Sequence, residues 1–308
     1  MKYADLSRIS DELKNCPPEF AVSEKREKLL MQMDKLLGEA FSEFTPALGK
    51  YYDAQVERVL EEVSAYDGKV PRFWKLYSSG FIIKDAGKVI AFDINNGCEH
   101  HNARATIALK PSKIRQLAQM IDEYYCTHSH VDHISPELCD ALARRKKLLV
   151  MPEQSRKCWR IPRAIAAEKV NLPHIRTYLN WQGNAEGGLD CSMYHLTLSN
   201  GKTVFVRGDI YHAEGFLGCM DFLDKNKLHV DYVFTSHYST SGPEPIPFLD
   251  EKYKCCFVPI HEWEFTHRKM GKQGPATQCF EELYGVYRSY YNESRTQFLS
   301  WGESILLK

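Results

Sequence analysis

The sequence predicts a mixed α/β fold that follows a helical N-terminal segment. Apolar residues recur at helical spacing through roughly the first 65 residues. From Pro71 onward, β-rich runs are joined by a hairpin signal, and strands then alternate with helices to the end of the chain. Hairpins early and strand–helix alternation later are typical of the mixed α/β class. A chain of 308 residues is long enough for one large domain or two smaller ones.

Two helices are expected in the N-terminal segment, residues 1–68. Between Leu29 and Phe41 the apolar residues fall on one helical face. Thr45-Pro46 supplies an N-cap and a first helical position for the second helix, and Asp67-Gly68 ends it. We therefore expect a helical hairpin as one unit that packs against, or forms a lid over, a second domain that comprises residues 69–308.

The first strands of that domain are expected at residues 73–84 and 88–94. Asp85-Ala86-Gly87 between them is a hairpin signal. A helix that opens at Pro111 follows, then a short apolar strand at residues 124–126. Ser135-Pro136 caps the next helix. The later expected elements are strands at 148–151, 175–179, 191–198, 203–207, 230–235, 255–260 and around Phe298, and helices at 216–222 and 276–291.

Composition indicates an ordinary soluble globular protein. Lys and Arg total 40 and Asp and Glu total 40, which argues against a long nucleic-acid partner that needs a basic track. None of the ten cysteines forms a C-x-x-C pair, so a structural zinc finger is not expected. The first residues carry charges where a signal peptide has its apolar run, and no apolar run of about 18 residues would span a membrane. We expect a cytoplasmic protein.

The segment THSHVDH, residues 127–133, places three histidines and an aspartate directly after a short predicted strand. Imidazole is the commonest ligand for zinc and related metals, and a carboxylate adds a harder oxygen ligand. In an extended segment His128 and His130 project to the same side and can hold one ion together. Asp132 and His133 can face the same cavity from another direction. The segment therefore predicts a site for one or two metal ions.

THSHVDH resembles the H-x-H-x-D-H motif of the metallo-β-lactamase superfamily. The strand end at Asp93 is similar to that family's strand that ends in an aspartate before a glycine-containing loop. Gly208-Asp209 resembles the strand end that delivers a metal-bridging carboxylate, and His261 resembles the final histidine of the second metal site. The resemblance covers most of the chain from about Pro71 onward. It implies an αββα sandwich, in which two mixed β-sheets carry helices on both outer faces and the metal ligands gather at one edge.

The resemblance also implies a set of ligands, with zinc as the expected metal and manganese or iron as alternatives. Asp93 would orient a ligand histidine through its other ring nitrogen. The family usually has a further histidine before the bridging aspartate, but the window of residues 184–190 contains none. Asn184 or Asp190 could supply an oxygen ligand there, or the first site stays weak or empty. The expected metal ligands are His128, His130, Asp132, His133, Asp209, His261 and Asp190.

The family resemblance implies a metal-dependent hydrolase in which a metal-bound hydroxide attacks an ester, lactone or amide of a small molecule. The candidate catalytic residues are Asp132, His212 and His237. Alternatives are a phosphodiesterase acting on a small phosphodiester or cyclic nucleotide, and a degraded site kept for binding. A redox role as in flavodiiron proteins is disfavoured, because His130 stands where those proteins use a carboxylate. No membrane or nucleic-acid partner is expected, and a homo-oligomer is compatible with the sequence.

Overall fold

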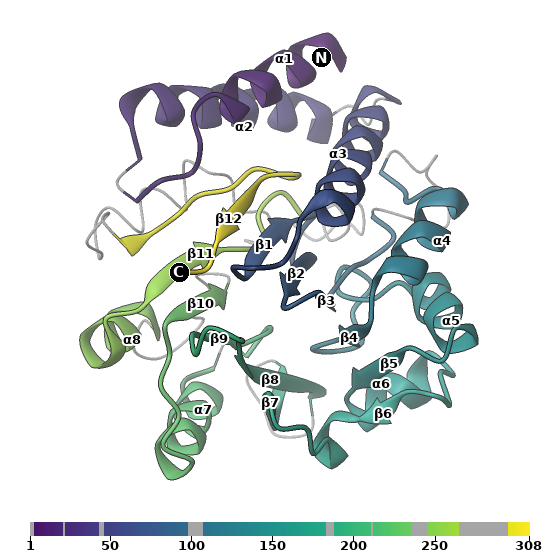
Figure 1. Ribbon diagram of the computed structural model, residues 1–308, viewed down its shortest axis with the longest axis vertical. Helices are drawn as coiled ribbons and strands as arrows, with labels where there is room; N and C mark the ends of the chain where they lie inside the picture. Colours follow the sequence, from purple (N-terminus) through teal and green to yellow (C-terminus); the bar gives the residue numbers. More distant parts are fainter. Residues whose placement is uncertain are drawn as a thin grey trace.

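Two β-sheets with helices on their outer faces form the frame of the protein in a computed structural model (Figure 1). The structure describes residues 3–20, 22–42, 46–97, 107–182, 188–210, 212–235, 245–264 and 295–308. Both sheets are mixed, since each contains parallel and antiparallel pairs. The αββα arrangement that the sequence resemblance implies is confirmed.

The first sheet has seven strands in the order β12-β1-β2-β3-β4-β5-β6. Pairing is antiparallel from β12 to β3 and parallel from β3 to β6. The strands are β1 (Arg72–Lys75), β2 (Phe81–Asp85), β3 (Lys88–Phe92), β4 (Glu123–Tyr125), β5 (Leu148–Met151), β6 (Ile165–Ala166) and β12 (Ser304–Leu306).

The second sheet has five strands in the order β11-β10-β9-β8-β7. Strands β9, β10 and β11 are parallel, and β8 runs antiparallel to both β7 and β9. Strand β7 therefore points in the same direction as β9, so their carboxyl ends share one edge. The strands are β7 (Ile175–Gln182), β8 (Leu189–Thr197), β9 (Thr203–Val206), β10 (Tyr232–Thr235) and β11 (Cys256–Pro259).

The helices lie outside the sheets, and the N-terminal ones gather at one end of the molecule. In Figure 1, α4, α5 and α6 lie beside strands β4 to β6, while α7 and α8 lie on the side of the second sheet. The helices are α1 (Tyr3–Lys14), α2 (Glu24–Ser42), α3 (Pro46–Ala65), α4 (Pro111–Met120), α5 (Pro136–Arg144), α6 (Glu153–Cys158), α7 (Ala213–Lys225) and α8 (Pro245–Tyr253), with a 3₁₀ turn at Ala167–Lys169.

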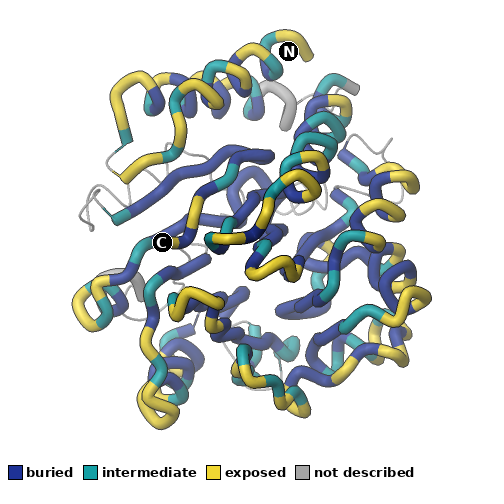
Figure 2. Tube along the Cα trace, in the orientation of Figure 1, coloured by how far each residue is buried: buried dark blue, intermediate teal, exposed yellow. Residues whose placement is uncertain are grey.

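An aromatic core holds the two sheets together. Because strand side chains alternate between faces, Phe81 and Phe92 point between the sheets and stack at a centroid distance of 4.8 Å. Phe234 of the second sheet packs edge-on against Phe81 at 5.1 Å, and Tyr194 packs against Tyr125 at 5.4 Å. Figure 2 shows the strands as an almost continuous buried centre beneath partly exposed helices. This core fixes the relative position of the strand ends from which the site is built.

Several elements differ from the sequence-based expectation. Residues 73–84 form two strands, β1 and β2, because the chain turns between them with Ser78 at φ 53° and Leu76 N bonded to the Gly80 carbonyl at 2.8 Å. The N-terminal segment has three helices rather than two, and the sequence does not predict α6, β6 or α8. The last strand lies at Ser304–Leu306 rather than around Phe298. The helix expected at residues 276–291 lies outside the described residues.

The N-terminal helices share a hydrophobic core with the sheets and are joined to the C-terminal segment by a buried ion pair. Nη1 and Nη2 of Arg26 on α2 lie 3.0 and 2.6 Å from Oε1 and Oε2 of Glu303, and both side chains are almost fully buried. The same guanidinium donates to the carbonyls of Cys16 and Phe298, each at 2.6 Å. A planar fork suits this bidentate arrangement.

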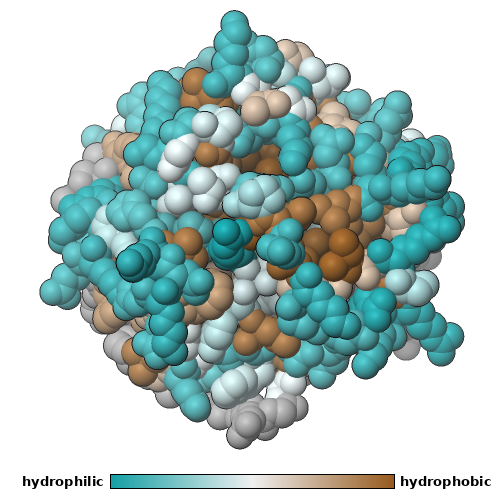
Figure 3. All heavy atoms as spheres, turned by 60° about the horizontal axis from the view of Figure 1, so that its bottom comes forward, coloured by the Kyte–Doolittle hydropathy of each residue, from teal (hydrophilic) through white to brown (hydrophobic). Residues whose placement is uncertain are grey.

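The surface carries a mixture of polar and apolar residues. On the face shown in Figure 3, hydrophilic residues cover most of the area and hydrophobic residues gather in a patch near its middle. Within the described part of the chain, no helix is both long and apolar enough to cross a membrane.

Arg26→Ala is expected to lower the free energy of unfolding by about 3–5 kcal/mol, because it leaves the buried Glu303 carboxylate without its partner. Arg8→Ala is the matched control: Arg8 forms an exposed pair with Glu12 on α1 and should cost less than about 1 kcal/mol. Urea unfolding followed by circular dichroism measures both. Equal losses in the two variants would contradict the assigned role of the buried pair.

Candidate metal centre

The candidate ligands come from strand ends that meet at one edge of the sandwich. Strand β4 runs directly into THSHVDH, β9 is followed by Asp209, and β11 is followed by His261. Because β4 is parallel to β3 and β9 is parallel to β11 through β10, the carboxyl ends of each set lie together. Residues far apart in the sequence are therefore brought side by side.

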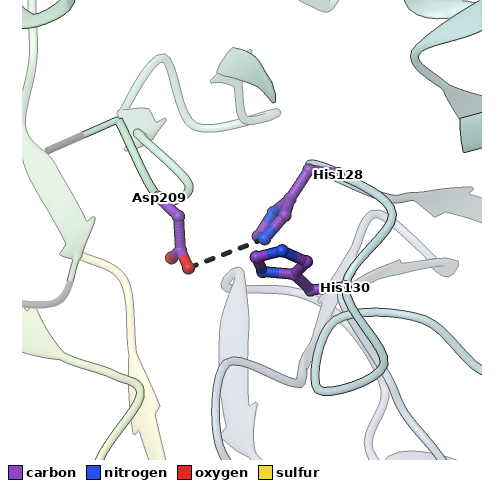
Figure 4. A group of neighbouring side chains, drawn as sticks. All are labelled: His128, His130 and Asp209. Atoms are coloured by element: carbon purple, nitrogen blue, oxygen red, sulfur yellow. Dashed lines mark ion pairs between the residues drawn. The ribbon is translucent and has the colours of Figure 1, made fainter. Parts of the chain in front are cut away.

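The first group comprises His128, His130 and Asp209, whose ligand atoms all lie within 4.8 Å of one another. Figure 4 shows the two imidazoles side by side on one loop, facing the Asp209 carboxylate across a gap. Nε2 of His128 lies 3.6 Å from Oδ2 of Asp209. His128 and Asp209 are buried and His130 is partly exposed, so His130 marks the solvent side of the group.

The second group comprises Asp132, His133 and His261, all buried, with ligand atoms again within 4.8 Å of one another. Nε2 of His261 lies 3.0 Å from Oδ2 of Asp132 and 3.1 Å from Nε2 of His133. Nε2 of His133 also lies 3.3 Å from Oδ2 of Asp209, which therefore faces both groups. The structure thus brings together six of the seven ligands that the sequence predicts.

Asp93, at the end of β3, orients His133. Its Oδ2 lies 2.9 Å from Nδ1 of His133 and accepts the Thr127 hydroxyl at 2.7 Å, while Oδ1 accepts the Thr127 backbone N–H at 2.7 Å. A carboxylate on Nδ1 holds the proton there and leaves the Nε2 lone pair pointing into the site. The orienting role expected for Asp93 agrees with this geometry.

The protonation equilibria reflect the crowding of carboxylates and imidazoles. Burial lowers the pKa of His128 well below its usual value, and His133 lowers it further. Burial would also lower the pKa of His133, but the Asp209, Asp132 and Asp93 carboxylates raise it well above the usual range. Despite burial, the neighbouring His133, His261 and His128 hold the pKa of Asp209 well below its usual value. The carboxylates therefore favour positive charge at this edge.

Three strand ends at the site adopt left-handed backbone conformations, namely Asp93 at φ 44°, Gly208 at φ 62° and His261 at φ 77°. Such conformations are costly for residues other than glycine and concentrate at functional sites. At Gly208 a Cβ atom would lie 2.9 Å from both Sγ of Cys191 and Cβ of Thr127. Glycine is thus required immediately before Asp209.

Asp190 does not join either group. It lies on β8, its backbone N–H donates to Oε1 of Gln154 at 2.8 Å, and its side chain is partly exposed. The structure therefore does not place Asp190 among the ligands. Asn184, the other candidate for the missing ligand, lies outside the described residues.

His212 caps α7. Its Nδ1 accepts the Gly215 N–H at 2.9 Å, and its Nε2 donates to the Trp181 carbonyl at 3.1 Å. Both ring nitrogens are therefore engaged by backbone groups, which favours a structural role for His212 over the expected acid role. His237, the other candidate acid, lies outside the described residues.

Sequence reasoning did not identify two polar side chains at the site. Nε2 of Gln182, the last residue of β7, lies 3.3 Å from Oδ2 of Asp209. Oγ of the buried Ser79 lies 3.5 Å from Nε2 of His133. A polar residue at the end of a strand is the available signal for Gln182, but the apolar pattern predicts that this strand ends at residue 179. Ser79 lies in the turn between β1 and β2, where the sequence predicts one continuous strand.

The two groups fit metal ions. Nε2 of His128 is buried and has no hydrogen-bond partner among the described residues. The Nε2 atoms of His133 and His261 face each other at 3.1 Å, close to the separation of about 3.3 Å expected between two donors of one zinc ion. Imidazole nitrogens and carboxylate oxygens are the donors that zinc, manganese and iron accept.

Gly208→Ala is expected to destabilise the fold by about 1–3 kcal/mol more than Gly201→Ala, because only residue 208 adds a clash to the backbone strain. Gly201 has φ 82°, and an added Cβ there would have nothing within 4 Å, so its variant reports the strain alone. Urea unfolding measures the difference. Equal destabilisation would show that the contacts with Cys191 and Thr127 do not constrain the loop.

Comparison with known proteins rests on structure alone. No protein-family model matches the sequence, and no curated protein matches it. A possible metal-dependent hydrolase from Veillonella parvula DSM 2008 is similar with a TM-score of 0.56 at 10% identity, over 77% of this chain and 100% of that one. An isothiocyanate hydrolase from Delia radicum gut bacteria is similar with a TM-score of 0.56 at 16% identity, over 77% of this chain and 98% of that one.

The same architecture also occurs in a protein with another activity. The β-hydroxylase CmlA is similar with a TM-score of 0.51 at 11% identity, over 78% of this chain and 54% of that protein. Identities of this size show a shared fold and leave the reaction to be argued from the site. With its two mixed sheets, its flanking helices and its H-x-H-x-D-H segment at the sheet edge, the chain has the metallo-β-lactamase fold.

Proposed function

We propose that the protein is a metal-dependent hydrolase that binds zinc at the two ligand groups. The observation that carries the proposal is that six side chains from three strand ends converge into two groups of three, with ligand atoms within 4.8 Å in each. Manganese or iron would be accepted by the same donors. The surrounding polar contacts support this assignment, because Asp93 leaves Nε2 of His133 directed at the second group.

In this proposal the two groups together hold the metal ions that activate the substrate and the water. Metal ions bound there would polarise an electrophilic carbonyl and make water nucleophilic near neutral pH. Asp209 links the groups, since its Oδ2 lies 3.6 Å from Nε2 of His128 and 3.3 Å from Nε2 of His133. Oδ2 of Asp132 lies 3.0 Å from Nε2 of His261, and this contact helps to hold the second group together. All of the ligand side chains are buried except that of His130, which is partly exposed.

The exposed residues of the ligand segment support a substrate with apolar character. His130 is partly exposed, and the neighbouring Val131 is 42% exposed within the ligand segment itself. An exposed apolar side chain between two ligand residues provides contact for an uncharged acyl group. We therefore propose an ester, lactone or amide of a small molecule as substrate, and a small phosphodiester as the alternative.

Asp209→Asn is expected to reduce both metal content and hydrolysis by about 100-fold or more, because loss of even an outer-shell partner costs about 10- to 100-fold. Asp190→Asn is the matched control, since Asp190 lies outside both groups and should keep wild-type metal content. Metal analysis of protein purified after zinc-supplemented expression provides the readout. Wild-type protein without metal would contradict the proposal, as would an Asp209→Asn variant that retains both ions.

Chelation is expected to abolish hydrolysis, and added zinc is expected to restore it. A panel of nitrophenyl esters, lactones, nitroanilides and bis-nitrophenyl phosphate identifies the bond that is cleaved. Turnover of the carboxylic esters, lactones or amides supports the proposed substrate class. Turnover of the phosphodiester alone would replace that class with the alternative. No turnover of any compound by fully metallated protein would contradict a hydrolase with this broad substrate class.

A further inference from the structure

One side chain at the end of β7 lies beside the first ligand group, and the proposed function gives it no role. Nε2 of Gln182 lies 3.3 Å from Oδ2 of Asp209. That oxygen also faces Nε2 of His128 at 3.6 Å and Nε2 of His133 at 3.3 Å. The amide of Gln182 therefore lies at the carboxylate oxygen on which both groups converge.

Strand direction explains why this residue reaches the site. Strand β7 points the same way as β9, because both are antiparallel to β8. Its last residue, Gln182, therefore lies at the sheet edge where β9 delivers Asp209. Gln182 is still within the ladder, paired with Leu189, so its backbone is held by the sheet.

Contacts with α7 fix the end of β7 from the other side. The Trp181 carbonyl accepts Nε2–H of His212 at 3.1 Å, and the two rings stack at 4.8 Å with an interplanar angle of 20°. Nδ2 of Asn180 donates to the Gly215 carbonyl at 3.2 Å. These contacts hold the end of β7 against the first turn of α7, so the backbone from which the Gln182 side chain extends has a fixed position. A fixed backbone limits the positions that the Gln182 amide can take relative to Asp209.

The chemistry and the distance both suit a fourth ligand. Among the described residues the first group offers three protein ligands, and donors that lie about 2.0–2.2 Å from one zinc ion in a tetrahedron are about 3.3 Å apart. The separation between the Gln182 amide and Oδ2 of Asp209 is of this size. Rotating the amide by half a turn exchanges its nitrogen and its oxygen, and the oxygen is the ligand atom.

We propose that Gln182 is the fourth protein ligand of the first group, with its amide oxygen in the place of the histidine that the sequence lacks. The inference rests on the proposed function, because it requires that the first group binds a metal ion. A carbonyl oxygen in place of an imidazole makes the group harder. The first group therefore binds manganese more tightly, relative to zinc, than it would with histidine at position 182.

The test is cobalt titration of the metal-free full-length chain, followed by d–d absorption and by the number of ions bound. The wild type is expected to bind two ions. Gln182→Leu should weaken one of them by at least about tenfold and leave the other unchanged. Gln182→His should retain both ions, change the absorption spectrum and shift the preference of the weaker site from manganese toward zinc. Gln119→Leu, on the exposed face of α4, is the matched control and should behave as wild type.

Each outcome bears on one of the two claims. A wild type that binds no cobalt contradicts the proposed function itself. Two wild-type ions with unchanged affinities and spectrum in Gln182→Leu overturn only the role of Gln182, whereas a wild type that binds a single ion contradicts the two-group metal centre of the proposed function. If Gln182→Leu does not fold, Gln182→Glu provides the same test, because a carboxylate ligand should tighten the weaker ion, and unchanged affinity would overturn the assignment.

Discussion

The burial of three carboxylates among four imidazoles at one sheet edge is the constraint on which the rest of the structure depends. An ionised carboxylate without partners costs several kcal/mol to bury. Asp93 offsets this cost through three hydrogen-bonding contacts to Thr127 and His133, while Asp132 and Asp209 face imidazole nitrogens. These contacts work only if the strand ends keep their positions, which is why the chain tolerates left-handed backbone at Asp93 and His261.

Much of this arrangement could be predicted from the sequence because it follows strand direction. A segment such as THSHVDH immediately after an apolar strand places its side chains at a carboxyl end, and Gly208-Asp209 and His261 follow strands in the same way. That these ends meet at one edge, and that Asp209 and His261 join THSHVDH there, is implied by the resemblance to the metallo-β-lactamase superfamily. The glycine before Asp209 is constrained both by its own φ of 62° and by Cys191 and Thr127, which are remote in the sequence and leave no room for a Cβ.

The features that the sequence did not predict depend on contacts between elements rather than on the pattern within one element. The length of β7 is decided by its pairing with β8, which continues to Gln182 beyond the apolar residues that signal the strand. Likewise, a histidine three residues after Asp209 looks available for proton transfer, yet both ring nitrogens of His212 are engaged by α7 and Trp181. In each case a contact with a neighbouring strand or helix overrides the pattern of apolar and polar residues.

The N-terminal helices support the second ligand group from outside the sandwich. Nε1 of Trp263, two residues after His261, donates to Oδ1 of Asp34 on α2 at 2.7 Å. The residue between them, Glu262, is fully buried and pairs with Lys75, whose Nζ also donates to the Pro259 carbonyl at 2.7 Å. Glu262 and Trp263 are therefore fixed by these contacts, and they follow directly on His261, which has a strained φ of 77°. Because an isolated left-handed residue costs about 1–2 kcal/mol, the loop needs such anchors, and α2 supplies one that the sheets alone do not.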